Sequence, residues 1–459
     1  MKNGMLNGMV VLMLFQVFAV AEAAERKIDL SISTEYYMVG GLFINPFLPV
    51  EGEETTITVR ANLTEKIDGP VPAQLEILDR GGKTLARELL PLTVREITKE
   101  IDNQPVTEWI AEAAWKWSSA TNGLFQVRAT LDPEQQIQES DESNNQADID
   151  LAVIIKDRPL YFPWYQEHQR PIRWGNIVTT ANSKEQREYL TERGVKALIW
   201  QYGGMPWTNH DGVRDREGEE EALKQIEEHF RVQYSNIPDN AAGYGIDEIG
   251  GYPESWFEKK SAASMKALQW AKQQRPDLFY AVWCAGGTRD SFGKYFRDAA
   301  DLVMLEIYIW DALPKYLHTE DIYKVIRNRV EPYYRIYDMM VSTYGSPCHT
   351  VVGLDVAEAV DITNLGELEE VVRFIRREFP ELRGQGWYSG ALYKNEKGEL
   401  NEPRHQEIVR FASDLNLKYY IKPCLTLMEH SLWLERYENG TATLTAAVSN
   451  IGAMDAGPL

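Results

Sequence analysis

The feature that most constrains the fold of this chain is a change in the spacing of its apolar residues. From about Asp157 to Tyr420, short apolar runs such as "KALIWQYGG" and "FYAVWCAGG" alternate with stretches whose apolar residues recur at i, i+3, i+4 and i+7. The runs are typical of buried parallel strands, and the longer stretches of helices that bury one face against a sheet. Eight such runs predict a closed (β/α)₈ TIM barrel, although the first two, "LYFPWY" and "NIVTTA", have no clear helix between them. A seven-stranded sheet and a doubly wound sheet stay open as alternatives.

The segment before the barrel has a different pattern. Residues 24–156 contain short alternating runs such as "TTITVRANL", separated by Gly, Pro, Asn and Asp, which predicts an all-β sandwich. The run "GLFQVRATLDPEQQIQESDESNNQADIDLAV" resembles the last two strands of a CARDB-type immunoglobulin-like domain, in which an acidic, Asn-rich hairpin precedes the final strand. We interpret this hairpin as solvated, with a calcium (Ca²⁺) site as the alternative. Its acids are Asp132, Glu134, Glu139, Asp141 and Glu142.

Both ends of the chain carry further signals. Residues 1–23 combine an early Lys2, a short apolar run and an A-x-A spacing, which predicts a secretory signal peptide cut near Ala23. Residues 421–459 are predicted to begin a second CARDB-like sandwich, because "TLTAAVSNIGAMDAGPL" repeats the strand-and-turn pattern of "TITVRANLTEKIDGPVPA". The predicted order is therefore a signal peptide (1–23), a sandwich (24–156), a barrel (157–420) and a partial sandwich (421–459).

Charge and hydropathy restrict the partners. A formal net charge of −21 repels phosphate backbones, so we expect no nucleic-acid partner. No later run is long and apolar enough to span a bilayer, so we expect no membrane insertion and a secreted, periplasmic or cell-surface protein. The seven His residues are dispersed, which gives a zinc site or a Ser-His pair little support. We expect no cofactor in the barrel.

Acids and aromatic residues end several barrel strands, where the chemistry of such barrels is located. Asp247 and Glu248 end the fourth run in "GYGIDEIGG", Glu306 ends the sixth and Asp355 the seventh. Strand alternation places Met304, Glu306 and Tyr308 on one face. The aromatic candidates for substrate binding are Trp164, Trp207, Trp283, Tyr308, Trp310 and Trp387.

Carboxylates among aromatic rings fit the cleavage of a glycosidic bond, in which one protonated acid donates to the leaving oxygen and a second carboxylate attacks, activates water or stabilises the transition state. We predict that Glu248 is the donor. The sequence resembles retaining glycoside hydrolases that carry Asn-Glu after strand four and Glu after strand seven, but it has Asp247 and Asp355 in two of these places. "GYGIDEIGG" is also similar to the Gly-rich Asp-Glu pair of hexosaminidase-type barrels. The mechanism therefore stays open.

The predicted function is that of a secreted glycoside hydrolase acting on a poly- or oligosaccharide, with sandwich modules that place it on a polymer or a cell surface. Two alternatives stay open: a non-catalytic barrel that binds carbohydrate, and adhesion by the sandwiches with the barrel as a spacer. The acids also have structural alternatives, as helix caps or as partners of buried Arg residues. Each Trp has the alternative of simple packing.

Overall fold

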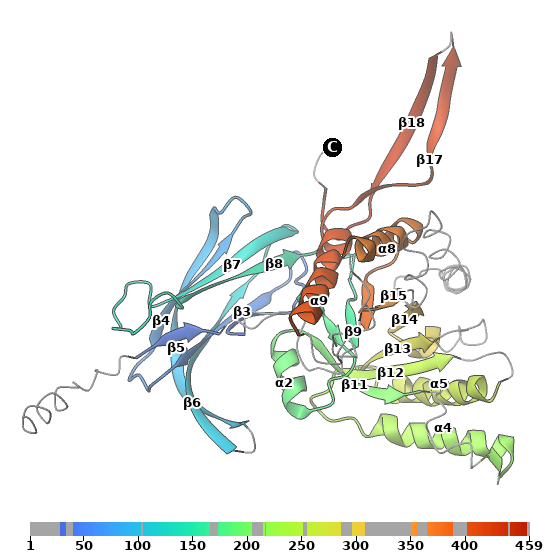
Figure 1. Cartoon of the computed structure of the whole chain (residues 1–459), viewed down its shortest axis with the longest axis horizontal. Coiled ribbons are helices and arrows are strands. Elements are labelled where there is room, and N and C mark those ends of the chain that lie inside the picture. The colour runs from blue at the N-terminus through green and yellow to red at the C-terminus, as the bar shows by residue number, and fades with distance from the viewer. Residues whose placement is uncertain are drawn as a thin grey trace, which may run out of the picture. The chain divides into compact units, whose positions relative to one another are not determined.

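The computed structural model of the chain (Figure 1) divides into two compact units. The first comprises Met1–Phe43, Ile57–Trp115 and Gln126–Asp150, and the second comprises Ile44–Thr56, Lys116–Phe125 and Leu151–Leu459. The predicted domain boundaries stay predictions, and the signal segment lies outside the described residues. The structure describes residues 28–33, 40–101, 104–165, 173–203, 214–215, 217–250, 255–285, 296–307, 350–356, 365–388, 402–438 and 441–456.

The N-terminal part of the chain is all-β. Its sheet runs in the order β1-β3-β6-β5-β4-β7-β8, with β2 paired to β3. Buried and half-buried residues alternate along the whole of β3, so one face of that strand is in the core. The immunoglobulin-like arrangement predicted here stays a prediction. The strands are β1 (Leu30–Ile32), β2 (Leu42–Asn45), β3 (Thr55–Leu63), β4 (Val71–Leu78), β5 (Thr84–Ile101), β6 (Gln104–Trp117), β7 (Gly123–Leu131) and β8 (Gln146–Val153).

The acidic hairpin between β7 and β8 uses its carboxylates within the sheet. Asp132 Oδ2 accepts a hydrogen bond from the backbone N–H of Ile137 at 2.6 Å. Glu139 accepts from the backbone N–H of Leu30 and from the Asn145 side chain, both at 2.8 Å. Among the described residues, no three His, Cys, Asp or Glu side chains are arranged to hold a metal ion. The calcium alternative therefore finds no ligand cluster in this hairpin.

Eight parallel strands close into a barrel in the second unit. The last strand pairs with the first, with Trp387 opposite Trp164, so the sheet has no open edge. This confirms the predicted eight-stranded barrel, and the seven-stranded and doubly wound alternatives are wrong. The described residues between the first two strands, 173–176, contain a turn and no helix. The strands are β9 (Pro163–Tyr165), β10 (Ile177–Val178), β11 (Lys196–Tyr202), β12 (Gly243–Gly250), β13 (Phe279–Ala285), β14 (Leu302–Ile307), β15 (Thr350–Asp355) and β16 (Gln385–Tyr388).

Helices connect these strands and cover the outside of the barrel (Figure 1). Two of them begin at serines, because the hydroxyl of Ser183 and that of Ser255 each accept a hydrogen bond from a backbone N–H of the first turn. The helices are α2 (Lys184–Glu192), α4 (Glu219–Ser235), α5 (Trp256–Gln274), α8 (Leu365–Glu378) and α9 (Glu402–Asn416).

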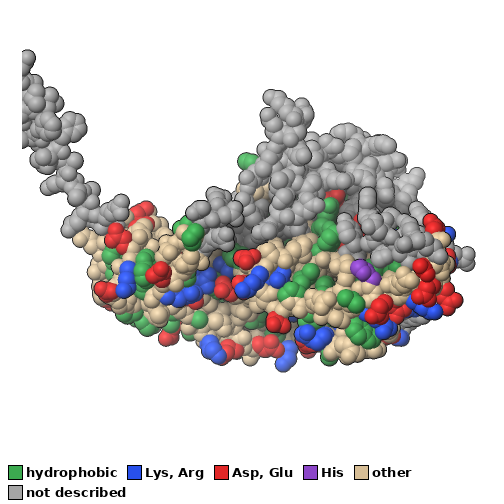
Figure 2. All heavy atoms as spheres, turned by 90° about the horizontal axis from the view of Figure 1, so that it is seen from below, with side chains coloured by type: hydrophobic (Ala, Val, Ile, Leu, Met, Phe, Trp, Pro, Cys, Tyr) green, Lys and Arg blue, Asp and Glu red, His purple; other side chains and the backbone are tan. Residues whose placement is uncertain are grey.

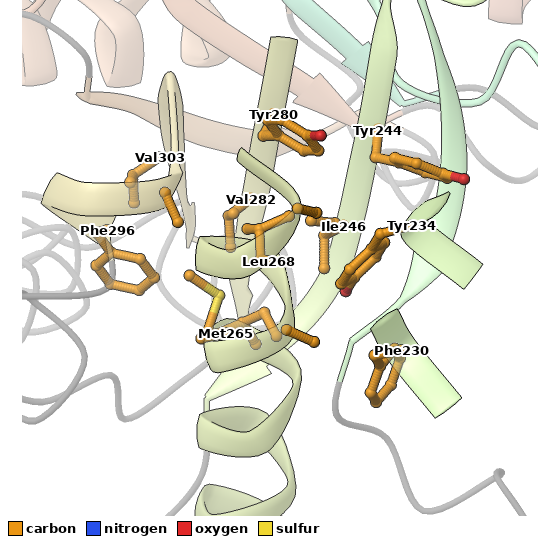
Figure 3. Close-up of a cluster of buried hydrophobic side chains, with 14 of the residues drawn as sticks. Phe230, Tyr234, Tyr244, Ile246, Met265, Leu268, Tyr280, Val282, Phe296 and Val303 are labelled. Carbon is orange, nitrogen blue, oxygen red and sulfur yellow. The ribbon is translucent and has the colours of Figure 1, made fainter. Parts of the chain in front are cut away.

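One hydrophobic cluster fills the space between the barrel wall and its helices. Figure 3 shows Met265 and Leu268 of α5 directed toward Ile246 of β12 and Val282 of β13. All four side chains are fully buried. These four residues and others packed with them, among them Ile249, Cys284, Val303 and Leu305, form what we call the outer cluster. Its burial fixes which residues of β12 and β13 face outward.

A second cluster fills the barrel itself. It is formed by Ile177, Leu198, Ala281, Trp283, Leu302, Met304 and Val351, and we call it the interior cluster. Two glycines make room for the indole of Trp283: a Cβ added to Gly353 would lie 2.2 Å from that ring, and one added to Gly386 would lie 3.5 Å from it. The barrel is therefore a packed core, and its chemistry is restricted to the strand ends.

After α9 the chain forms a short π-helix, η3 (Leu417–Ile421), and then an antiparallel pair, β17 (Leu425–Glu438) and β18 (Thr441–Asn450). Large apolar side chains of this pair are exposed, among them Leu427 and Leu444. The pair occupies the region where a second sandwich is predicted to begin, and that assignment stays a prediction.

The surface has two further properties. Within the described ranges, no helix has both the length and the apolar character that crossing a membrane requires. Acidic and basic side chains are interspersed over the face shown in Figure 2.

The packing around Trp283 yields a stability prediction. Gly353→Ala should lower the free energy of unfolding by about 1–3 kcal/mol, because the new methyl overlaps the indole. Gly386→Ala is the matched control on the neighbouring strand, and it should cost less because its closest contact is 3.3 Å. Calorimetric melting of both variants is the measurement. Equal melting temperatures would contradict the packing described.

Candidate active site

A β-bulge interrupts β12 at its carboxyl-terminal end. Ile246 pairs with Val282 and Ile249 with Cys284, so three steps along β12 match two along β13. Ile246 and Ile249 both belong to the outer cluster. The extra residue breaks the strict alternation of the strand, so Asp247 and Glu248 both lie between two outward-facing residues. Bulges of this kind re-aim side chains, and this one holds the predicted acid pair.

Glu248 occupies the left-handed region of backbone conformation, with φ of +57°. For a residue with a Cβ, this conformation costs on the order of 1–2 kcal/mol. Such strain persists only where the surroundings determine it, and it concentrates at functional sites. The strained residue is the one predicted to be the proton donor.

Asp247 is 6% exposed and is held by donors from three elements. Its Oδ1 accepts a hydrogen bond from the backbone N–H of Glu248 at 2.9 Å, and its Oδ2 accepts from Nε1 of Trp200 on β11 at 3.3 Å. The phenol of Tyr165 on β9 donates a third hydrogen bond. Asp247 therefore has a defined orientation at the inner side of the strand ends.

The two carboxyl groups have raised pKa values. Burial raises the pKa of Asp247 to about 6, against the opposing effect of its three donors. Burial also raises the pKa of the half-buried Glu248 to about 7, and the neighbouring charge of Asp247 adds to this rise. A carboxyl group that keeps its proton near neutral pH can act as a general acid, so Glu248 has the protonation state that this role requires.

Two further acids lie on the inner face of the barrel. Leu302 and Met304 belong to the interior cluster, and Val303 and Leu305 to the outer one, so Glu306 points inward in the same alternation. It is 7% exposed. The sequence pattern predicts that Met304 and Glu306 share one face of the strand, and the structure confirms this.

Asp355 also points inward, because inward-facing and outward-facing residues alternate along β15 as they do along β14. Val351 belongs to the interior cluster and Gly353 lies beneath the indole of Trp283, so Asp355 lies on the inner face at the end of β15. It is 2% exposed. Neighbouring strands are ~4.8 Å apart, so the backbones of β12 and β14 are separated by roughly 10 Å.

Aromatic rings surround the acids on the inner face. Tyr165 is central: its ring contacts the edges of Trp200 and Trp283, with centroids 6.4 and 6.0 Å away, and lies 4.9 Å from the ring of Tyr388. Trp283 is fully buried, and its Nε1 has no hydrogen-bond partner among the described residues. Of the aromatic residues predicted to bind substrate, Trp283 is the one that the described structure places on the inner face.

Trp164 and Trp387 lie elsewhere. Gly386 faces the interior, so the next residue, Trp387, faces outward, where its Nε1 donates to Asn416 of α9 at 3.1 Å. Trp164 stacks on Trp387 with a centroid distance of 5.8 Å, and both side chains are fully buried. Both belong to the packing between barrel and helices, and we leave them out of the proposed site. Trp207, Tyr308 and Trp310 lie outside the described residues.

Three residues of this site, Tyr165, Trp200 and Tyr388, were not among the sequence candidates. Tyr165 directly follows the candidate Trp164, and Trp200 directly precedes Gln201 at the end of β11. Tyr165 and Tyr388 each adjoin a candidate, Trp164 and Trp387, so their signal was a pair of aromatic residues near a strand end. A strand as short as β9, Pro163–Tyr165, has too few residues for its period to show which neighbour faces inward.

Comparison with solved structures finds likenesses to two kinds of protein. A CARDB domain from Pyrococcus furiosus, solved in complex with di-metal ions, is 17% identical over 28% of this chain and 90% of that chain, with a TM-score of 0.19. The beta-glucuronidase of Ruminococcus gnavus is 10% identical over 85% of this chain and 69% of that chain, with a TM-score of 0.35. A cycloisomaltooligosaccharide glucanotransferase from Paenibacillus sp. is 10% identical over 69% of this chain and 53% of that chain, also with a TM-score of 0.35.

The resemblances to CARDB domains and to glycoside hydrolases that the sequence motifs carry recur among these solved structures. No protein-family model matches the chain, and no curated protein matches it in sequence.

The raised pKa values predict how stability depends on pH. A carboxyl group whose pKa is higher in the folded than in the unfolded state binds more protons when folded, so stability falls as pH rises from the unfolded pKa to the folded one. For Glu248 this window runs from 4.5 to about 7. Glu248→Gln removes this contribution, so the variant should gain stability relative to the parent as pH rises through the window. Thermal melting between pH 4.5 and 8 measures it.

The control for that experiment is Glu228→Gln, which changes an exposed glutamate on α4. Its melting temperature should follow that of the parent at every pH. A Glu248→Gln curve parallel to the parent would show that Glu248 is not protonated in the folded protein near neutral pH.

Proposed function

We propose that the barrel is a glycoside hydrolase and that Glu248 is its general acid. The observation that carries the proposal is the strained bulge at the end of β12, which presents a carboxyl group with a pKa near 7 next to the buried Asp247. Cleavage of a glycosidic bond requires a proton for the leaving oxygen, and a protonated Glu248 would supply it. Closed barrels host many chemistries, so the argument rests on this site and not on the fold.

A second carboxylate completes the reaction. Glu306 and Asp355 are the candidates, because each lies on the inner face of its barrel strand, β14 two positions and β15 three positions from β12. One of them would attack the anomeric carbon, or would activate a water molecule on the opposite face of the sugar. Asp247 is less suited to either role, since its three donors already occupy its oxygens.

The proposed substrate is a poly- or oligosaccharide. The inner rings of the half-buried Tyr165 and Tyr388 give the site apolar surfaces, which suit the C–H faces of sugars. The beta-glucuronidase and glucanotransferase named above are enzymes of this general class, and their particular substrates are not carried over to this chain. Export after cleavage near Ala23, and attachment to a polymer or cell surface through the sandwich modules, are part of the same proposal.

Glu248→Gln tests the donor. The amide cannot donate an acidic proton, so turnover of unactivated oligosaccharides should fall by about 100-fold or more. Aryl glycosides with good leaving groups need little protonation and should lose much less. Reducing-sugar release and p-nitrophenol release from glycosides of the same sugar are the two measurements, with Glu228→Gln as the control. Equal activity of Glu248→Gln and parent on both substrates would remove the proposed donor.

Replacing each second acid by alanine identifies the partner. If Glu306 or Asp355 is a nucleophile, its removal should lower turnover of a p-nitrophenyl glycoside by about 100-fold or more, because the covalent path is lost. Azide can occupy the vacated space and attack in its place, so it should restore activity to that variant alone and yield a glycosyl azide. Full activity of both alanine variants would exclude both residues. Binding of a polysaccharide by the parent protein without any turnover across a polysaccharide panel would instead favour the non-catalytic alternative.

A further inference from the structure

The bulge that carries Glu248 is held from one side by side chains of two other barrel strands. The side chains that contact the Asp247 carboxylate are Tyr165 of β9 and Trp200 of β11, both far from Asp247 in the sequence. The β11 strand also holds the main chain there, because the N–H of Gly203 donates to the carbonyl oxygen of Asp247 at 2.8 Å. A Cβ at Gly203 would lie 2.4 Å from Ile249 and 2.7 Å from Ile246, so this close approach needs glycine.

Trp200 is itself fixed at both ends. Its backbone N–H donates to Oδ1 of Asn182 at 3.1 Å, and its indole N–H donates to Asp247 at 3.3 Å. Tyr165 packs against the edge of the Trp200 ring while its phenol donates to the same carboxylate. The rings of Tyr165 and Trp200 therefore pack against each other, and each donates a hydrogen bond to the Asp247 carboxylate.

We propose that Tyr165 and Trp200 are positioning residues: by holding the Asp247 carboxylate against the backbone N–H of Glu248, they fix the left-handed bulge that presents the proton donor. We call these four residues the clamp. The inference rests on the proposed function only where it calls Glu248 the proton donor. The clamp itself is defined by hydrogen bonds and backbone geometry. Neither ring donates a proton to the substrate in this scheme.

The clamp accounts for three observations together. The strained φ of Glu248 persists because its N–H has a charged acceptor on the preceding residue. Asp247 tolerates burial because three donors compensate for lost solvation. The negative charge kept at Asp247 in turn favours the protonated form of Glu248. Removal of either ring donor should loosen the Glu248 N–H before it affects the rest of β12.

Amide hydrogen exchange of the full chain tests the clamp without any ligand. Tyr165→Phe removes one donor and keeps the ring, and Trp200→Phe removes the other. Each should raise the exchange rate of the Glu248 amide by about tenfold, because a charge-assisted hydrogen bond is weakened. The matched control is Tyr244→Phe, which removes the hydroxyl that donates to the carbonyl of Gln233 at 2.7 Å on the outer face of the same strand. That control should leave the exchange of Glu248 unchanged.

Activity provides the second readout. In Tyr165→Phe, kcat for an unactivated oligosaccharide should fall about tenfold with little change in KM, while a p-nitrophenyl glycoside of the same sugar should be spared. Unchanged Glu248 exchange in both ring variants would overturn the clamp, even if Glu248→Gln abolished turnover. Faster exchange together with an active Glu248→Gln variant would support the clamp and reject the proposed function. The two failures are therefore distinguishable.

Discussion

The hydrogen bond between the Asp247 carboxylate and the backbone N–H of Glu248 is the contact on which the candidate site depends. It stabilises a left-handed residue inside a strand, and this residue converts the regular alternation of β12 into a bulge. Without the bulge, one of two adjacent acids would face the outer cluster, where a carboxyl group would have no solvent. With it, both lie between Ile246 and Ile249, which keep their places in that cluster.

The other acids of the site are placed by the packing of the barrel strands, which bury one face inside the barrel and the other against the helices. Residues of β14 alternate between the interior and outer clusters, and that alternation carries Glu306 inward. The interior leaves no room for chemistry, because the Trp283 indole lies against Gly353. Polar groups therefore collect at the strand ends. Desolvation by this packing is also the main cause of the raised pKa values of Asp247 and Glu248.

Much of this arrangement could be predicted from local patterns. The eight strands, the acid pair after the fourth and the inward facing of Met304 and Glu306 follow from apolar periodicity, which depends only on neighbouring residues. The weakness of the first barrel unit was also visible in the sequence, and the described part of that connection, residues 173–176, contains a turn and no helix. The aromatic candidates were harder to place. Trp164 and Trp387 end strands as Trp283 does, yet they pack outward against each other and α9.

The sequence by itself determined the period of each segment, and with it the eight strand-like runs and the acids at their ends. Only the tertiary structure decided that the sheet closes, which aromatic residues face inward and what the acids touch. Tyr165 and Trp200 are separated from Asp247 by long stretches of chain, and closure of the sheet brings them to one carboxylate. The bulge at Glu248 is likewise a property of the pairing between β12 and β13, because an extra residue is defined only against a partner strand.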